Sequence, residues 1–346
     1  MKHINVALFV PDEGCPHRCS FCNQKTISGK VTPLEADEID KAVQVALKNI
    51  GCNEGEIAFF GGSFTAIDRN YMTELLSRAY RYVEQGLFKG IRISTRPDCI
   101  SEEILDILKK YGVTAIELGC QSMIDDVLLL NTRGHSEEDV VLSARLIKEY
   151  GFELGLQMMT GLYGDSDDGA VKTAEKIIAL SPDTVRIYPT VVLEGTKLCE
   201  LYRKGEYTPQ TVEQAAELCK KLLVMFEEKG IKVIRLGLHS GGNVDEGFVA
   251  GAYHPAFREI CESKIYFDKV LEAIKNEGIS EGEIEITVGS SFVSMLTGQK
   301  RCNIKKLNEM GFKVKIIQNK EYEKYKLMVS SIIRESDYIH HPSVRG

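Results

Sequence analysis

The feature that most constrains the fold of this chain is a regular alternation of short apolar runs with amphipathic stretches over residues 4–190. Each apolar run has the length of a strand, and each is followed by helical periodicity or by a turn that leads into it. The six runs are Ile4–Val10, Ile57–Phe60, Ile91–Thr95, Thr114–Leu118, Leu154–Met158 and Thr184–Tyr188. Strands that alternate with helices form a parallel sheet covered by helices. The order therefore predicts an α/β fold, specifically a partial (β/α)6 barrel of the TIM type.

Local signals set the expected boundaries of some elements. Thr32 and Pro33 form an N-cap and N1 pair, which predicts a helix from there to about Ile50. Ser136 and Asp139 have the spacing of a capping box. We expect residues 1–238 to form the barrel, with 232–238 as a further edge strand. Residues 239–346 should form a helical and small α/β extension with a basic tail.

The loops that carry unusual residues all follow strands. Cysteines follow the first strand, Gly61-Gly62-Ser63 the second, Ser94 lies near the end of the third, and Gln121 follows the fourth. In barrels of parallel strands the active site collects at the carboxyl ends of the strands. We therefore expect these loops to face a single mouth.

Three cysteines, Cys15, Cys19 and Cys22, are spaced C-x3-C-x2-C within eight residues. Thiolates so close together can converge on one soft metal centre. A structural zinc normally takes four protein ligands, and His17 would be cramped as the fourth. A cubane has four irons, so three cysteines leave one iron open. The spacing favours an iron–sulfur cluster, with zinc and a purely structural trio as the alternatives.

Other residues at the expected mouth have both functional and structural interpretations. Gly61 and Gly62 allow a ligand close to the backbone, or form an ordinary tight turn. Gln121 can bind a ligand or satisfy a loop backbone. Arg133 suits bidentate carboxylate recognition. Gln157 is polar within an apolar run and needs a partner.

The chain resembles a known family in several motifs. Phe21 is an aromatic residue just before the last cysteine, as in the radical S-adenosylmethionine (SAM) enzymes. The segments 61–64, 94–98, 117–122, 133–135 and 159–164 read Gly-Gly-Ser-Phe, Ser-Thr-Arg-Pro-Asp, Glu-Leu-Gly-Cys-Gln-Ser, Arg-Gly-His and Met-Thr-Gly-Leu-Tyr-Gly. Together they resemble the radical-SAM domain of the Elongator catalytic subunit family, over about residues 1–235. A more distant likeness is to oxygen-independent coproporphyrinogen oxidase.

The resemblance implies cofactors and partners. It implies a [4Fe-4S] cluster on the three cysteines, with SAM bound to the open iron. An electron donor such as flavodoxin or ferredoxin would reduce the cluster, which splits SAM into methionine and a radical that abstracts hydrogen from a substrate. The protein positions and shields such a cofactor.

The same resemblance implies which residues contact SAM, and it assigns no catalytic residue. Ser63 stands where Glu or Thr is usual, and Ser94 where Glu is more often found. The implied SAM contacts are Phe21, Gly61, Gly62, Ser63, Ser94, Gln121, Arg133 and Gln157.

The substrate stays open at this level. A tRNA nucleoside is expected by analogy with Elongator, and a porphyrin is the alternative. Acetyl transfer is not expected, because the residues after 235 contain no R-x-x-G-x-G/A motif. A different class of function is a non-enzymatic iron–sulfur or zinc protein that binds RNA through its basic tail. The cations in question are Lys300, Arg301, Lys305 and Lys306, and they surround their helix rather than form one stripe.

Composition limits the setting. The net charge of −7 argues against wholesale coating of nucleic acid. No segment has the length needed to span a membrane. The other cysteines suggest no disulfide framework, so we expect a reducing, cytoplasmic location. The sequence does not indicate an oligomeric state.

Overall fold

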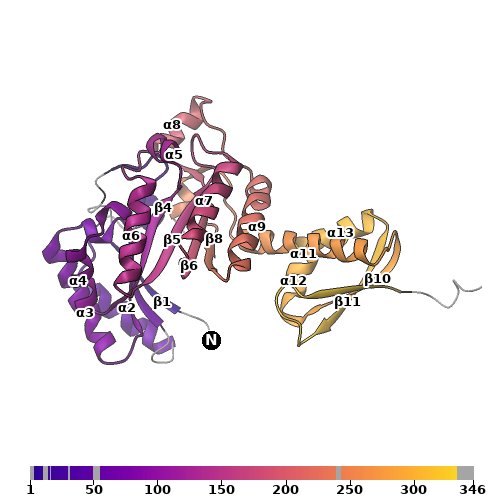
Figure 1. Cartoon of the computed structure of the whole chain (residues 1–346), viewed down its shortest axis with the longest axis horizontal. Helices are drawn as coiled ribbons and strands as arrows, with labels where there is room; N and C mark the ends of the chain where they lie inside the picture. The colour runs from indigo at the N-terminus through magenta and orange to yellow at the C-terminus, as the bar shows by residue number, and fades with distance from the viewer. Residues whose placement is uncertain are drawn as a thin grey trace, which may run out of the picture. The chain divides into compact units, whose positions relative to one another are not determined.

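The computed structural model describes residues 4–10, 15, 17–29, 32–49, 55–238 and 243–332 (Figure 1). The chain divides into two compact units, one ending at Pro255 and one beginning at Ala256. Each unit is described by itself below.

The first unit is built on a curled, half-barrel sheet of seven parallel strands in the order β1-β2-β3-β4-β5-β6-β8. Sequence neighbours are therefore spatial neighbours throughout. The predicted α/β partial barrel is confirmed, and β8 is the expected additional edge strand. The strands are β1 (Ile4–Val10), β2 (Gly55–Gly61), β3 (Gly90–Thr95), β4 (Val113–Gln121), β5 (Glu153–Thr160), β6 (Thr184–Pro189) and β8 (Lys232–Leu236).

Amphipathic helices cover one face of this sheet, as Figure 1 shows. The strand residues beneath them are apolar and have no exposed surface, for example Ile57, Ile93 and Leu118. Burial of this apolar surface is the main driving force for the layer arrangement. The covering helices are α2 (Ala36–Asn49), α3 (Arg69–Glu84), α4 (Glu102–Lys110), α6 (Glu137–Glu149), α7 (Asp167–Ala179) and α9 (Val212–Glu228).

One predicted helix start is wrong and another is confirmed. Helix α2 begins at Ala36, not at Pro33, because the Glu35 N–H donates to the carboxylate of Glu38 (2.8 Å) and the Glu35 carbonyl accepts from the Glu38 N–H. The capping box is present: Ser136 N–H donates to Asp139 (2.7 Å) and Asp139 N–H donates to the Ser136 hydroxyl (3.3 Å).

A small ribbon extends the first unit beyond the sheet. Strand β7 (Val191–Leu193) pairs antiparallel with β9 (Phe248–Gly251). This pairing ties residues after β8 to the loop after β6, so the first unit extends past residue 238. Residues 239–242, where the predicted extension starts, lie outside the described residues.

The second unit is a three-stranded sheet with helices. Strand β10 (Gly282–Gly289) pairs parallel with β11 (Phe312–Asn319) and antiparallel with β12 (Leu327–Ser331). Helix α11 (Phe257–Asn276), α12 (Val293–Thr297) and α13 (Cys302–Glu309) accompany it. The predicted small α/β extension is present. Within the residues described, no helix is both long and apolar enough to cross a membrane.

Candidate functional site

The three motif cysteines lie in the loop that follows β1. Each is half-buried, and none of the nine described cysteines is in a disulfide. The Cys22 N–H donates to the Cys19 carbonyl at 3.2 Å, so these two residues form a tight turn. Across the described part of the chain, no three His, Cys, Asp or Glu side chains are grouped as a complete metal-ligand set. The three cysteines are therefore neighbours on one loop, but their side chains are not arranged as a metal-ligand set.

Hydrogen-bond donors surround two of these thiols. Arg133 Nη1 lies 2.9 Å from Cys19 Sγ, and Gln24 Nε2 of the short helix α1 (Gln24–Ser28) lies 3.2 Å from Cys22 Sγ. Both contacts are hydrogen bonds from nitrogen donors to the sulfur atom, which is the ligating atom of cysteine. Three cysteines, two of them with such a donor, are one ligand short of a structural zinc site and match the three protein ligands expected for an iron–sulfur cluster.

Phe21 packs inside the protein on the same loop. Its ring contacts one apolar cluster that includes Met159 and Leu162, and another that includes Val192 and Leu198. These residues belong to β5, to the loop after it, to β7 and to helix α8 (Lys197–Arg203). Phe21 therefore anchors the cysteine loop on the carboxyl-terminal side of the sheet, and its predicted contact with SAM stays a prediction.

The glycine pair ends β2 next to β1. Gly61 has φ +120°, and a Cβ atom there would lie 2.2 Å from the Val10 carbonyl oxygen. The Gly62 N–H donates to that same oxygen at 3.1 Å. Glycine is therefore required at position 61 by the close approach of two strands. The loops that follow both strands start from this point of contact.

Ser63 directly follows the glycine pair in the chain, and its side chain is buried, with 1% of the residue exposed. Its hydroxyl lies 2.8 Å from Thr95 Oγ1 and accepts a hydrogen bond from the Arg96 N–H at 3.3 Å. It thus joins the ends of β2 and β3. Ser94 is half-buried and pairs in register with Glu117 of β4. For both serines the SAM contact implied by the resemblance stays a prediction.

Gln121, Gln157 and Arg133 come together at the end of β4. Gln157 Nε2 donates to Gln121 Oε1 at 3.1 Å, and Arg133 Nη2 donates to the Gly119 carbonyl at 2.6 Å. Gln121 has φ +67° at a register shift in β4, which turns its buried side chain toward this group. The partner that the Gln157 amide needed is therefore Gln121.

A buried positive corner adjoins these residues. Arg96 is 4% exposed and donates twice to Asp98, at 2.9 Å each, and once to the Arg133 carbonyl. His135 Nε2 lies 3.2 Å from the Cys120 carbonyl. Burial, together with Arg133 and Arg96, lowers the pKa of His135 to about 4, so its imidazole is neutral at pH 7.

Three buried nitrogens in this corner have no hydrogen-bond partner among the described residues: Arg96 Nη1, Arg133 Nε and His135 Nδ1. The two guanidinium nitrogens are donors, and an unsatisfied buried donor costs about 1–3 kcal/mol, so such groups usually meet a ligand or water. Nδ1 of the neutral His135 is an acceptor, because Nε2 donates to the Cys120 carbonyl. Two of the three belong to guanidinium groups. The corner therefore suits an anionic group such as a carboxylate.

The face of the sheet away from the covering helices carries charges that the sequence analysis missed. Arg92 donates to Glu56 (2.8 Å), to Glu153 (2.8 Å) and to Glu117 (3.3 Å). Arg186 donates twice to Glu117, once at 2.9 Å. The sequence carries this pattern, because Arg92, Glu117 and Arg186 each stand between two apolar residues, which is the period of two that one sheet face requires.

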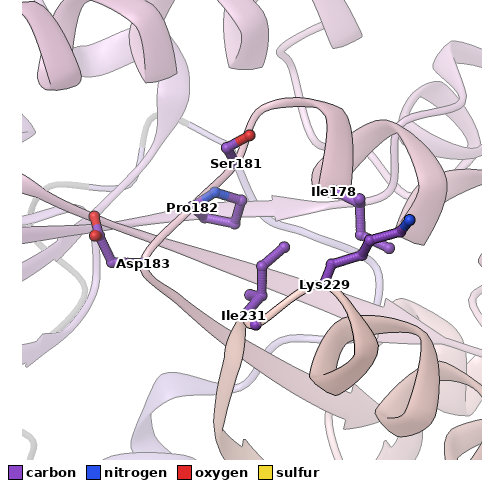
Figure 2. A pocket seen from close by; sticks show the side chains of 7 residues that line it. Ile178, Ser181, Pro182, Asp183, Lys229 and Ile231 are labelled. Carbon is purple, nitrogen blue, oxygen red and sulfur yellow. The ribbon is translucent and has the colours of Figure 1, made fainter.

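A surface hollow lies at the other end of the strands (Figure 2). It is formed where the chain enters β6 and β8, so it faces away from the cysteine loop, and it contains no predicted site residue. The lining residues are Ile178, Ser181, Pro182, Asp183, Lys229, Gly230 and Ile231.

Family comparisons match most of the first unit. Residues 10–177 match the radical SAM superfamily, and residues 182–266 match the radical SAM C-terminal domain. The tRNA uridine(34) acetyltransferase of Methanocaldococcus infernus is 28% identical over 254 residues, which cover 62% of this chain and 48% of that protein. Human Elongator complex protein 3 is 32% identical over 202 residues, covering 52% of this chain and 37% of that protein.

A solved structure supports the fold. The archaeal Elongator protein 3 of M. infernus, with its N-terminus deleted, superposes with a TM-score of 0.61 at 21% identity. The match covers 84% of this chain and 67% of that one. The chain spans about half the length, or less, of these two curated relatives.

Proposed function

We propose, because the chain belongs to the radical SAM superfamily, that it is an enzyme which binds a [4Fe-4S] cluster and SAM. Cys15, Cys19 and Cys22 would hold the cluster. When bound, the reduced cluster supplies the electron that cleaves SAM, and an external donor such as flavodoxin or ferredoxin would deliver it. Relatives of this chain are enzymes by name, which supports the proposal.

The observation that carries the proposal is the position of Arg133. One end of its guanidinium touches Cys19 Sγ, the other touches the Gly119 carbonyl beside Gln121, and Nε is buried without a partner among the described residues. Arg133 thus joins the metal-binding loop to a polar group at the end of β4. A cation in this place orients a carboxylate next to the cysteines.

The other residues of the site would bind SAM and shield the cluster from water. Gln121 and Gln157 offer amide groups to hydroxyls, and Gly61 allows a close approach of the backbone. Phe21 and the apolar clusters around it would exclude water from the cysteine loop. Exclusion of water strengthens every electrostatic interaction in such a site.

For the substrate we propose a tRNA nucleoside. The support is the name of the archaeal relative, a tRNA uridine(34) acetyltransferase. The test compares modified tRNA nucleosides from cells with and without this protein. An unchanged nucleoside profile would remove tRNA as the substrate class and leave the porphyrin alternative open.

The chemistry is tested with the anaerobically reconstituted protein. Reduced wild-type protein given SAM should form 5′-deoxyadenosine, and the Cys15→Ala/Cys19→Ala/Cys22→Ala variant should not. Equal product from both proteins would contradict the proposal. Retention of tRNA without any SAM turnover would instead favour the non-enzymatic RNA-binding alternative.

A further inference from the structure

We propose that Asn131 is a positioning residue that presets the turn between Cys19 and Cys22 for cluster binding. The inference rests on the proposed function, since it assigns a role in holding the cluster. Asn131 caps the C-terminus of the short helix that precedes α6 and is remote in sequence from the cysteines. It was not among the predicted site residues.

Ser20 follows Cys19, and each of its polar groups makes a hydrogen bond. Its N–H donates to the Asn131 carbonyl at 3.1 Å, and its hydroxyl donates to Asn131 Oδ1 at 2.7 Å. Its carbonyl accepts from the N–H of Leu198, in α8, at 2.8 Å. Ser20 is 1% exposed. The backbone between the two cysteines is therefore fixed by contacts with the C-terminal end of helix α5 (Asp125–Leu130) and with helix α8.

Asn131 itself is fully buried, and both the oxygen and the nitrogen of its side-chain amide make hydrogen bonds. Its amide nitrogen donates to the Val127 carbonyl of helix α5 and to the Tyr163 carbonyl in the loop after β5, each at 2.8 Å. With Oδ1 accepting from Ser20, only one orientation of the amide satisfies all three partners. Asn131 thus connects the cysteine loop to helix α5 and to the loop after β5.

The segment that contains Asn131 also contacts the thiol of Cys19. Arg133, two residues after Asn131, donates to Cys19 Sγ, so the backbone and the side chain of Cys19 are held from one segment. Because Cys22 N–H donates to the Cys19 carbonyl, fixing Ser20 also fixes the start of the turn that carries Cys22. Without the hydrogen bonds between Ser20 and Asn131, the turn between Cys19 and Cys22 would have to become ordered when the cluster binds. The entropy lost in this ordering would weaken binding.

Groups just outside a metal's ligands typically change metal affinity by about 10- to 100-fold when they are mutated. We expect Asn131→Ala to lose iron to a chelator about 10-fold faster than wild type under anaerobic conditions. Ser20→Ala, which removes the hydroxyl bond alone, should give a smaller increase. The double variant should lose iron no faster than Asn131→Ala, because both changes break one connection.

The matched control is Asn303→Ala in the second unit. Asn303 is also buried, and its amide nitrogen lies within 3.0 Å of the Ser263 carbonyl and hydroxyl and of the Leu296 carbonyl. This variant should destabilise the fold but leave iron loss unchanged. The electron paramagnetic resonance spectrum of the reduced cluster should change in Asn131→Ala and in Ser20→Ala but not in Asn303→Ala.

Two outcomes separate this inference from the function on which it rests. A wild-type protein that assembles no cluster overturns both. A wild-type cluster that responds to SAM, with iron loss and spectra unchanged in the Ser20 and Asn131 variants, overturns the positioning role alone. Should Asn131→Ala not fold, Ser20→Ala decides the question by the same two measurements.

Discussion

Arg133 Nη1 lies 2.9 Å from Cys19 Sγ, although the two residues are 114 positions apart in the chain. The contact joins the loop after β4 to the loop after β1, and it places a permanent positive charge on one cysteine of the motif. Charge and hydrogen bonds at cluster sulfurs are among the factors that set the reduction potential of iron–sulfur proteins.

The first prediction concerns this contact. Arg133→Gln removes the charge, and hydrogen bonds to charged groups contribute about 1.5–3 kcal/mol, so 5′-deoxyadenosine formation should fall by about 10- to 100-fold. The potential of the reconstituted cluster, measured without SAM, should become more negative. The control is Arg145→Gln, which alters an exposed helix ion pair with Glu149 and should change neither quantity. An unaltered potential would show that the guanidinium does not act on the cluster.

The second prediction concerns the β1–β2 contact. Gly61→Ala combines an unfavourable positive φ with a Cβ 2.2 Å from the Val10 oxygen. We expect the free energy of unfolding to fall by about 2–4 kcal/mol, measured by urea denaturation. Gly205→Ala is the matched control, because φ is +76° there but the added Cβ meets nothing within 4 Å. Gly205→Ala should lower the free energy of unfolding only by the cost of a left-handed backbone at a residue with a Cβ, about 1–2 kcal/mol. Equal losses at both positions would contradict the steric argument.

The third prediction concerns the charged face of the sheet. Glu117 is 4% exposed and accepts from both Arg92 and Arg186. Glu117→Ala removes the carboxylate to which the partly buried Arg186 donates, whereas Arg92 keeps Glu56 and Glu153, so the free energy of unfolding should fall by about 3 kcal/mol. Glu149→Ala, which breaks an exposed pair with Arg145, should cost less than about 1 kcal/mol. A loss at Glu117 as small as the control would mean that the network contributes little to stability.

The fourth prediction concerns pH. Burial lowers the pKa of His135 from its ordinary value of 6.5 to about 4, so between these values the unfolded chain binds the proton and the folded chain does not. The free energy of unfolding is therefore not reduced by His135 above about pH 6.5. It falls by about 3 kcal/mol in all as the pH decreases toward 4. His135→Gln should remove this dependence.

The measurement is urea unfolding of both proteins at several pH values, compared as the difference between wild type and variant. The comparison cancels other titrating groups such as Asp165, whose pKa burial raises to about 6 and which therefore acts in the opposite direction. A difference that does not change between pH 4 and 7 would contradict the shifted pKa of His135.

Local sequence was sufficient for the strands of the main sheet of the first unit. The period of the apolar runs gave six parallel strands in their spatial order, because in such a sheet each strand pairs with its neighbours in sequence. The Ser136–Asp139 capping box could be identified from three residues of spacing. The start of α2 could not, because two capping signals competed there and Glu38 prevailed over Thr32 and Pro33.

The sequence by itself determined that three cysteines follow the first strand of a parallel α/β sheet, since both facts depend only on spacing and periodicity. The tertiary structure decided what surrounds them. Ser20 meets Asn131 across 111 positions, and Glu117 meets Arg186 across 69. Such partners are chosen by the curvature of the sheet and the register of its loops, which bring distant polar groups together only after the apolar face is buried.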